Sequence, residues 1–168
     1  MFKVDEYIMC ARNGVCRVID IVVPDIKRDN NSSEYYKLQP VYDNKSIVYI
    51  PVNSDKIIMR ELISKEKAKD LINNINLIED LSFADDKVRE QKYKEIIHTY
   101  KCKELIKIVK TLYSKKKKSS VEKSRNTTID NKYLKVAEEY LLGELSISLD
   151  ISKEEVENYI VESMKRYA

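Results

Sequence analysis

Hydrophobic residues recur at spacings of three and four between residues 101 and 125. This spacing predicts a helix of about five turns with a single apolar stripe. Lys103, Lys107 and Lys110 fall on the opposite side, where we expect solvent, and four consecutive lysines at 115–118 close the helix. The apolar positions are Cys102, Leu105, Ile106, Val109, Leu112 and Tyr113.

The same stretch is strongly basic. It has ten Lys/Arg against two acids, a local charge of +8, whereas the whole chain has a net charge of only +3. A cationic amphipathic helix fits two roles: a solvated structural helix, or a surface for nucleic acid or anionic lipid. The stretch alone does not decide between them.

Residues 1–60 follow a different period, with alternating apolar and polar positions that predict strands. The predicted strands cover residues 7–11, 15–23, 34–39 and 46–52, and Pro40 and Pro51 stand at the ends of the last two. A polar loop is expected at residues 25–33. Four or five short antiparallel strands make a small open barrel or curled sheet. The strand at 46–52 is either a usable sheet edge or a buried central strand.

The three cysteines, Cys10, Cys16 and Cys102, lie in apolar patterns and predict buried reduced thiols rather than a disulfide or a metal site. Asn13-Gly14 is a hairpin turn signal. A two-residue turn at this doublet would pair Ala11 with Cys16 and put Cys10 and Cys16 on opposite faces of the sheet. That register would forbid a bond between the two sulfurs.

After Met59 the period changes to that of helices. Helices are predicted at residues 64–73 and 85–100, the second with an inward stripe that includes Tyr93. A polar, mobile loop is expected beyond Ser119. Asp130 is predicted to cap a long fourth helix, and Ser152 with Glu155 forms a capping box for a final helix. The expected inward residues of these last helices are Leu134, Ala137, Leu141, Leu145, Val156, Ile160 and Met164.

The sequence therefore predicts an α+β protein with a small antiparallel β domain at residues 1–60 and a domain of four to five helices at 61–168. The helical domain is basic in its middle and acidic at its end. We find no apolar run of about eighteen residues and no signal peptide, so we expect a cytoplasmic protein without a membrane segment. We expect it to be a monomer.

No catalytic constellation is found in the sequence. His98 has no metal partner at helical spacing, the only glycines, Gly14 and Gly143, cannot build a phosphate loop, and Cys10 and Cys16 lack the spacing of a zinc site. We therefore expect no enzyme, cofactor or metal. Two hypotheses remain: a helical domain that binds nucleic acid joined to a β domain that holds a protein by a strand edge, or an adaptor that binds proteins at both ends.

Four segments carry a resemblance to a known family: FKVDEYIMCARNGVCRVIDI near the start, then YYKLQP, IVYIPV and AEEYLLGELSIS. Their order and spacing resemble those of the CarD/CdnL family of bacterial transcription regulators. The last segment resembles that family's closing helix, with its A-R-x-x-L-x-x-E-L pattern. The N-terminal domain of this family is also found in the transcription-repair coupling factor.

The resemblance implies a Tudor-like β domain that holds the RNA polymerase β subunit and a helical domain that contacts promoter DNA without reading its sequence. It implies stabilisation of the open complex and a location at the nucleoid. The implied polymerase-binding positions are Ile47, Val48, Tyr49, Ile50 and Pro51. The implied DNA-binding positions are Arg89, Lys92, Lys94 and Lys132.

The chain departs from the family pattern at three places, two of which are among these positions. Arg89 stands where the family has a tryptophan that enters the minor groove, and the chain contains no tryptophan. Cys10-Ala11 replaces a tyrosine-proline pair, and Tyr49 replaces an arginine. The alternative to a DNA-contacting regulator is therefore a polymerase-binding or other protein adaptor without DNA contact.

Overall fold

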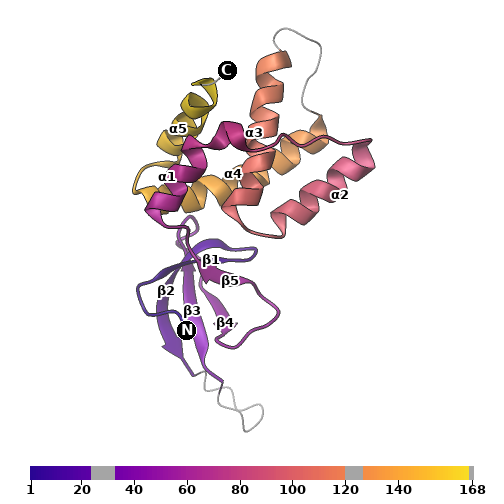
Figure 1. The fold of residues 1–168 in the computed structure, drawn as a ribbon. Coiled ribbons are helices and arrows are strands. Elements are labelled where there is room, and N and C mark those ends of the chain that lie inside the picture. Colours follow the sequence, from indigo (N-terminus) through magenta and orange to yellow (C-terminus); the bar gives the residue numbers. More distant parts are fainter. Residues whose placement is uncertain (24–32, 120–126, 167–168) are drawn as a thin grey trace. The chain divides into compact units, whose positions relative to one another are not determined.

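The computed structural model describes residues 1–23, 33–119 and 127–166, and the chain divides into two compact units, Met1–Leu62 and Ile63–Ala168 (Figure 1). In the described residues a five-stranded antiparallel sheet is followed by five α-helices, which confirms the α+β prediction. The units meet two residues beyond the predicted boundary. Most of the predicted loop at 25–33 and the predicted loop beyond Ser119 lie outside the described residues.

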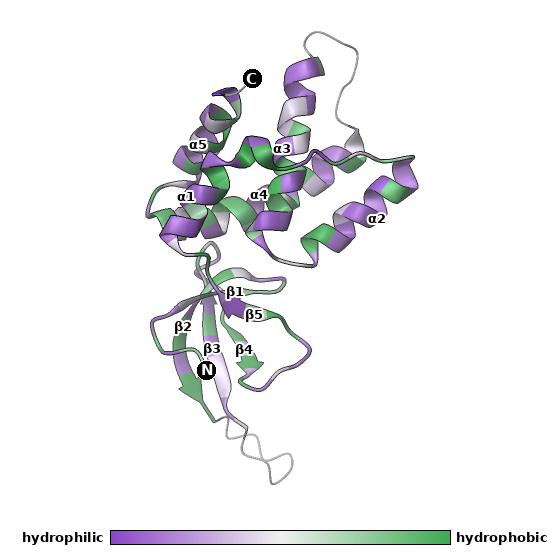
Figure 2. Cartoon of the chain, viewed as in Figure 1, coloured by the Kyte–Doolittle hydropathy of each residue, from purple (hydrophilic) through white to green (hydrophobic). Residues whose placement is uncertain are grey.

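The first unit, which we call the β unit, has the sheet order β4-β3-β2-β1-β5, so that β4 and β5 are the two edges. Its strands carry both apolar and polar residues, as the green and purple bands of Figure 2 show, and buried apolar residues form a core around Tyr36, Leu38 and Ile50. The strands are β1 (Tyr7–Cys10), β2 (Gly14–Val22), β3 (Tyr35–Pro40), β4 (Val48–Pro51) and β5 (Met59–Glu61).

The β1–β2 hairpin corrects the predicted register. Its loop has three residues, so Cys10 pairs with Gly14 and Ile8 pairs with Cys16. Arg12 (φ 70°) and Gly14 (φ 71°) both adopt left-handed backbone, and Gly14, the first residue of β2, does so without the steric cost of a side chain. Asn13-Gly14 therefore marks the hairpin but is not a two-residue turn. Cys10 and Cys16 lie on the same face, and the prediction of opposite faces was wrong.

The second unit, which we call the helical unit, begins with α1 (Lys65–Asn73), close to the predicted helix at residues 64–73. Ser64 is the cap of this helix and accepts a hydrogen bond from the Lys67 amide. The short strand β5 precedes it, where the sequence had indicated a change to helical period. The remaining elements are η1 (Ile75–Leu77), α2 (Asp86–Ile97), α3 (Cys102–Ser119), α4 (Thr128–Leu149) and α5 (Lys153–Lys165).

Two helix ends differ from the prediction. The helix α2 ends at Ile97, because Tyr100 adopts a left-handed backbone (φ 51°) that no helix can include. The cap of α4 is Thr127, and Asp130 is the third helical residue, where its side chain completes a capping box. The capping box of Ser152 and Glu155 at α5 is confirmed.

The helix α3 buries the predicted apolar stripe, including Leu105, Ile106 and Val109. Lys110 is also buried, although the sequence pattern had placed it on the wet side. Its ammonium donates to the Ile78 carbonyl and lies 3.4 Å from Asp80. Residues 78–85, between η1 and α2, pack over this side of α3. No local sequence pattern predicts this contact. Across the described residues, no helix has the length and apolar character needed to cross a bilayer.

Candidate interaction surfaces

Among the described strands, β4 pairs only with β3, so its outer side is an edge of the sheet. The Val52 amide donates to the Glu34 carbonyl (2.9 Å), and Ile50 and Val48 continue this register opposite Tyr36 and Leu38. In an antiparallel ladder alternate residues bond to the same neighbour. The main-chain groups of Val48 and Ile50 therefore face β3, and the N–H and C=O of Tyr49 face away from the sheet.

Side chains along β4 alternate in the same way. Ile50 is buried in the core, whereas the side chains of Ile47 and Tyr49 are exposed, Tyr49 by 53%. Val48 and Pro51 are half-buried. The five residues predicted from the sequence thus lie along one edge. The alternative of a buried central strand is excluded, because β3 is the only described neighbour of β4.

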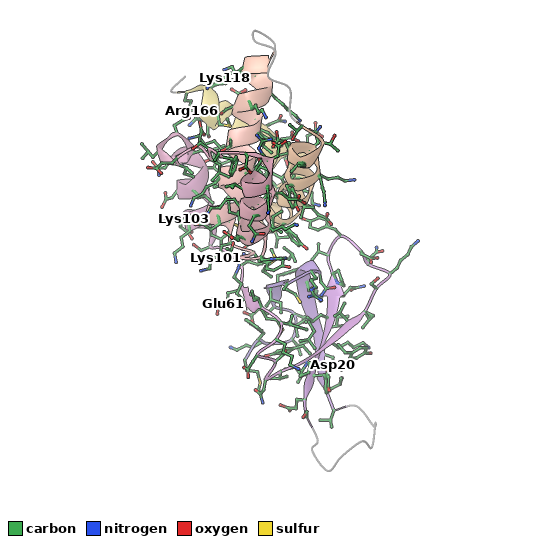
Figure 3. All side chains as sticks on the ribbon, turned by 90° about the vertical axis from the view of Figure 1, so that its right-hand side faces the viewer. Asp20, Glu61, Lys101, Lys103, Lys118 and Arg166 are labelled. Atoms are coloured by element: carbon green, nitrogen blue, oxygen red, sulfur yellow. The ribbon has the colours of Figure 1, made fainter. Side chains whose placement is uncertain are left out.

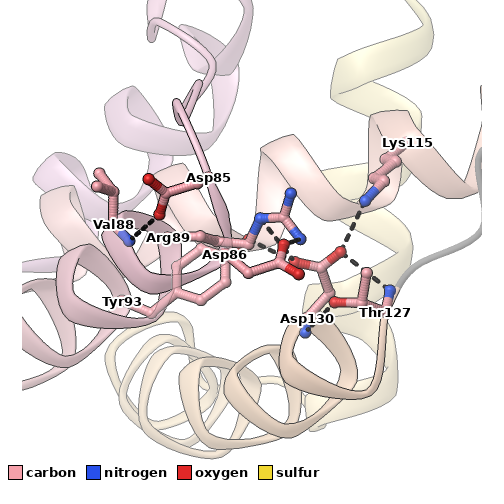
Figure 4. A network of polar contacts seen from close by, with 8 residues as sticks. All are labelled: Asp85, Asp86, Val88, Arg89, Tyr93, Lys115, Thr127 and Asp130. Atoms are coloured by element: carbon pink, nitrogen blue, oxygen red, sulfur yellow. Dashed lines mark hydrogen bonds and ion pairs between the residues drawn. The ribbon is translucent and has the colours of Figure 1, made fainter.

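The predicted DNA-binding residue Arg89 lies in a polar network rather than in solvent (Figure 4). Its guanidinium is 2.9 Å from Asp86 and 3.8 Å from Asp130, and it lies over the Phe83 ring at 5.8 Å. Its side chain is only 19% exposed. The first turn of α2 is therefore tied to the start of α4 through Arg89.

Asp130 is the centre of this network and is fully buried. One carboxylate oxygen accepts from the Tyr93 hydroxyl (2.9 Å), and the other accepts from the Lys115 ammonium (2.7 Å) and the Thr127 amide (3.1 Å). Burial by itself raises the pKa of Asp130, but the hydrogen bonds from Lys115, Thr127 and Tyr93 outweigh burial and lower it. Burial, and then the bond to Asp130, raises the pKa of Tyr93. Sequence reasoning missed this network because its members are far apart in the chain.

Lys94 and Lys132 lie near each other on the surface, with Glu90 between them. Lys94 is 3.5 Å from Glu90, Glu90 accepts from the Tyr133 hydroxyl (2.9 Å), and the Lys132 ammonium lies 5.1 Å from the Tyr133 ring centre. The hydrogen bond from Tyr133, followed by the charge of Lys94, lowers the pKa of Glu90. Burial and the bond to Glu90 raise the pKa of Tyr133 to about 12.

Lys92 projects from the other flank of α2. At 3.6 residues per turn, positions 92 and 94 point about 200° apart, on either side of the buried Tyr93. Lys92 lies 3.8 Å from Glu95. The structure therefore brings two of the four predicted DNA-binding residues together, Lys94 and Lys132, and separates Arg89 and Lys92 from them.

Most of the excess positive charge is on α3. It contains seven lysines and one acid, whereas α2 contains four Lys/Arg and three acids. Lys103 near the start and Lys118 near the end of α3 are exposed (Figure 3). Lys116 and Lys117 are exposed as well. Lys115 is different, because its ammonium is bound to Asp130.

A second buried carboxylate, Glu144 of α4, holds the beginning of the helical unit. It accepts from the Ile63 amide (2.8 Å) and from the Cys102 thiol (3.1 Å). This glutamate belongs to the GELS part of the segment that carries the family resemblance. Among the described residues, no cluster of three or more His, Cys, Asp or Glu side chains could hold a metal ion.

A comparison with known protein families decides what the β unit is. Residues 2–63 match the model of the CarD-like/TRCF RID domain. Residues 2–63 form a CarD-like/TRCF RID domain. The RID match covers β1 to β5 and ends one residue into the helical unit, so it does not describe the helices.

The CarD-like family is a family of transcription factors that interact with RNA polymerase, and it is regulatory rather than enzymatic. A search of curated proteins found no match to the chain. The chain thus combines a RID domain, in which β4 is an edge of the described sheet, with a helical unit that lies almost entirely beyond the matched residues.

Proposed function

We propose that this protein is a transcription regulator that binds the β subunit of bacterial RNA polymerase through β4 of its RID domain. In this proposal the helical unit contacts promoter DNA without sequence preference and stabilises the open complex. The protein acts as a monomer in the bacterial cytoplasm, at the nucleoid. The observation that carries the proposal is the open β4 edge, with Tyr49 exposed, inside a RID domain.

Pairing along β4 would use groups that the sheet leaves unused. The Tyr49 N–H and C=O face outward, so a partner strand can exchange main-chain hydrogen bonds with that residue. Pro51 has no N–H, which limits how far the added ladder can extend. The Tyr49 ring supplies a rigid aromatic anchor beside the new strand, the kind of residue that dominates binding energy at interfaces.

The DNA contact is proposed for the exposed lysines Lys92, Lys94 and Lys132, which can bind phosphates without reading bases. Arg89 remains a predicted DNA contact on one condition. Its guanidinium reaches a phosphate only by leaving Asp86 and Asp130, which it binds in the folded helical unit. A regulator that binds melted promoter DNA better than duplex shifts the equilibrium toward the open complex by that difference in affinity.

The polymerase contact is tested by pull-down of purified RNA polymerase with Tyr49→Ala. We expect binding to weaken about tenfold or more, because the aromatic anchor is lost. Tyr7→Ala is the matched control, since Tyr7 is exposed by 41% but lies on β1, which has a strand on either side. Binding by Tyr49→Ala at the strength of Tyr7→Ala and of the unchanged protein would remove β4 from the interface.

A second variant tests main-chain pairing. Tyr49→Pro removes an N–H that faces away from β3, so the ladder bonds of Val48 and Ile50 to β3 remain. We expect it to bind polymerase no better than Tyr49→Ala. If Tyr49→Pro bound polymerase as tightly as the unchanged protein, the β4 edge would not be used for strand addition.

The DNA contact is tested by measuring affinity for a forked promoter duplex across a salt series. Lys94→Ala with Lys132→Ala is compared with Lys116→Ala and Lys117→Ala, because each pair removes two exposed lysines. Losing two phosphate contacts changes the slope of log K against log salt by about 1.8. We expect that change in the first pair. A larger change in the second pair would move the DNA surface to the end of α3.

The alternative function is an adaptor that binds polymerase or another protein and makes no DNA contact. The near balance of charge on α2, four Lys/Arg against three acids, favours this alternative. It predicts that the unchanged protein shows no salt-dependent binding to the duplex.

A further inference from the structure

Cys10 and Cys16 lie side by side inside the RID domain. Because Cys10 pairs with Gly14 and Cys16 pairs with Ile8, the two cysteines are diagonal neighbours on one face of the β1–β2 hairpin. Both are fully buried, and both belong to the apolar core of the β unit. Both are free thiols.

Hydrogen bonds make the two sulfurs unequal. The Cys10 sulfur accepts from the Asn13 side-chain amide (3.5 Å), and its thiol donates to the Ala11 carbonyl (3.7 Å). The Cys16 thiol donates to the Gly14 carbonyl (3.8 Å). The contact with the neighbouring Cys16 thiol, with the bond from Asn13, lowers the pKa of Cys10 to about 7 against the opposing effect of burial. The same contact, together with burial, raises the pKa of Cys16. Cys10 is thus the more acidic thiol of the pair and the one that more readily forms a thiolate.

We propose that Cys10 and Cys16 form a reversible dithiol–disulfide pair that hydroperoxides oxidise. The Cys10 thiolate attacks the outer oxygen of the hydroperoxide, the O–O bond breaks, and the alcohol leaves with a proton. The Cys16 sulfur then attacks the sulfenic sulfur of Cys10, and the hydroxide that leaves takes the Cys16 proton as water. Two thiols and one hydroperoxide give one disulfide, one alcohol and one water.

The position of Cys10 and Cys16 in the hairpin determines how an oxidant reaches them and how strained their disulfide is. Cys10 is the last residue of β1, so opening of the adjoining loop, in which Arg12 is exposed, admits the oxidant to its sulfur. Diagonal neighbours have Cα atoms about 7–8 Å apart, somewhat farther than most disulfides. The oxidised hairpin must close slightly, so the bond is strained and easily reduced.

Cys102 provides an internal control. It is buried in the helical unit, its thiol donates to Glu144 (3.1 Å), and neither of the other two cysteines belongs to its core. A hydroperoxide that reacts through a neighbouring thiol should therefore oxidise Cys10 and Cys16 and leave Cys102 as a free thiol.

The experiment uses the full chain treated with hydrogen peroxide, then unfolded in the presence of a maleimide that labels every remaining thiol. Trypsin cuts after Arg12 and Arg17, so Cys10 and Cys16 fall in separate peptides that only a disulfide can join. We expect mass spectrometry to find these two peptides joined, with the loss of two hydrogen atoms, and Cys102 labelled. Dithiothreitol should restore labelling of both cysteines.

Variants separate the two steps. In Cys16→Ser the oxidation of Cys10 stops at the sulfenic acid, which dimedone traps, and Cys102→Ser leaves the joined peptides unchanged. Three results would each overturn the proposal: bonds that involve Cys102, bonds only between separate chains, or full labelling of Cys10 and Cys16 at a peroxide dose that oxidises glutathione. The inference does not depend on the proposed binding of polymerase or DNA.

Discussion

The two units of this chain fold by different means. The β unit has nine Lys/Arg and nine Asp/Glu, and none of its described charged residues is buried. The helical unit has 22 Lys/Arg and 19 Asp/Glu, and Lys110, Asp130 and Glu144 are buried in it. In a sheet, adjacent strands satisfy one another's main-chain groups, so that its core can be entirely uncharged.

Helices leave unpaired amides and carbonyls at their ends and in the segments between them. In the helical unit, side chains of the long helices satisfy these groups. Asp130 accepts from the Thr127 amide, Glu144 from the Ile63 amide, and Lys110 donates to the Ile78 carbonyl. Thr111 similarly accepts from the Leu81 amide (2.9 Å). The difference teaches that the buried charges of this unit have a structural role, so the presence of charged residues alone does not mark a binding surface.

Of the variants that test this comparison, Asp130→Ala should cause the largest loss of stability. It leaves Lys115 and Arg89 without their buried partner, and loss of one partner of a buried ion pair costs about 3–5 kcal/mol. Urea unfolding followed by helical circular dichroism measures the loss. Asp85→Ala, which removes only the exposed cap of α2, is the control and should cost about 1 kcal/mol. Equal losses in both variants would show that the network adds nothing beyond a cap.

Lowering the pH should gradually remove the contribution of Asp130 to the free energy of unfolding. Because the folded-state pKa of Asp130 is lowered, its contribution is fully present above the unfolded pKa of about 3.9 and is lost as pH falls through the folded value. The difference in unfolding free energy between the unchanged protein and Asp130→Asn should be constant from neutral pH to about 4 and then shrink. A difference that stays constant to lower pH would exclude a lowered pKa.

Glu144→Leu should have an intermediate effect. It leaves the Ile63 amide without its acceptor, and an unsatisfied buried donor costs about 1–3 kcal/mol. The same substitution at the exposed Glu139, also on α4, should change stability by less than about 0.5 kcal/mol. If the two variants unfold alike in urea, the buried carboxylate does not hold the start of the unit.

Tyr36→Phe tests the β unit and should have a smaller effect. The Tyr36 hydroxyl accepts from the Phe2 amide (2.9 Å) in the largely buried core, and loss of one neutral hydrogen bond costs about 1 kcal/mol. Tyr49→Phe removes an exposed hydroxyl and should be neutral in the same urea titration. If Tyr36→Phe lowers the free energy of unfolding by more than Glu144→Leu does, the buried polar bond of the β unit matters more than that of the helical unit, contrary to our expectation.

Cutting the chain between the two units should have the smallest effect on stability. Residues 63–168 alone should keep their helical circular dichroism and their urea midpoint, because their core residues all belong to the helical unit. Residues 1–62 should give a strand spectrum. A helical fragment that loses its structure would show that the units depend on each other for folding.

The sequence by itself determined the features that depend on residues a few positions apart. The change from period two to 3.6 predicted the fold class, and Ser64, Ser152 and Glu155 predicted helix starts that the structure confirms. The stripe on α3 was predicted from spacing alone. These features are local because a helix bond or a cap joins residues three or four apart.

Only the tertiary structure decided which residues meet across the chain. Tyr93 reaches Asp130 over 37 positions, and Glu144 reaches Ile63 over 81. The inward direction of Arg89 follows from the first of these networks. The burial of Lys110, the shared face of Cys10 and Cys16 and the open edge at β4 were likewise set by strand register and by covering segments. Strand alternation and helical period predict which face of an element is apolar, but they do not predict which segment packs against that face. Many segments have similar apolar patterns, so the contacts between them are decided only when the chain packs.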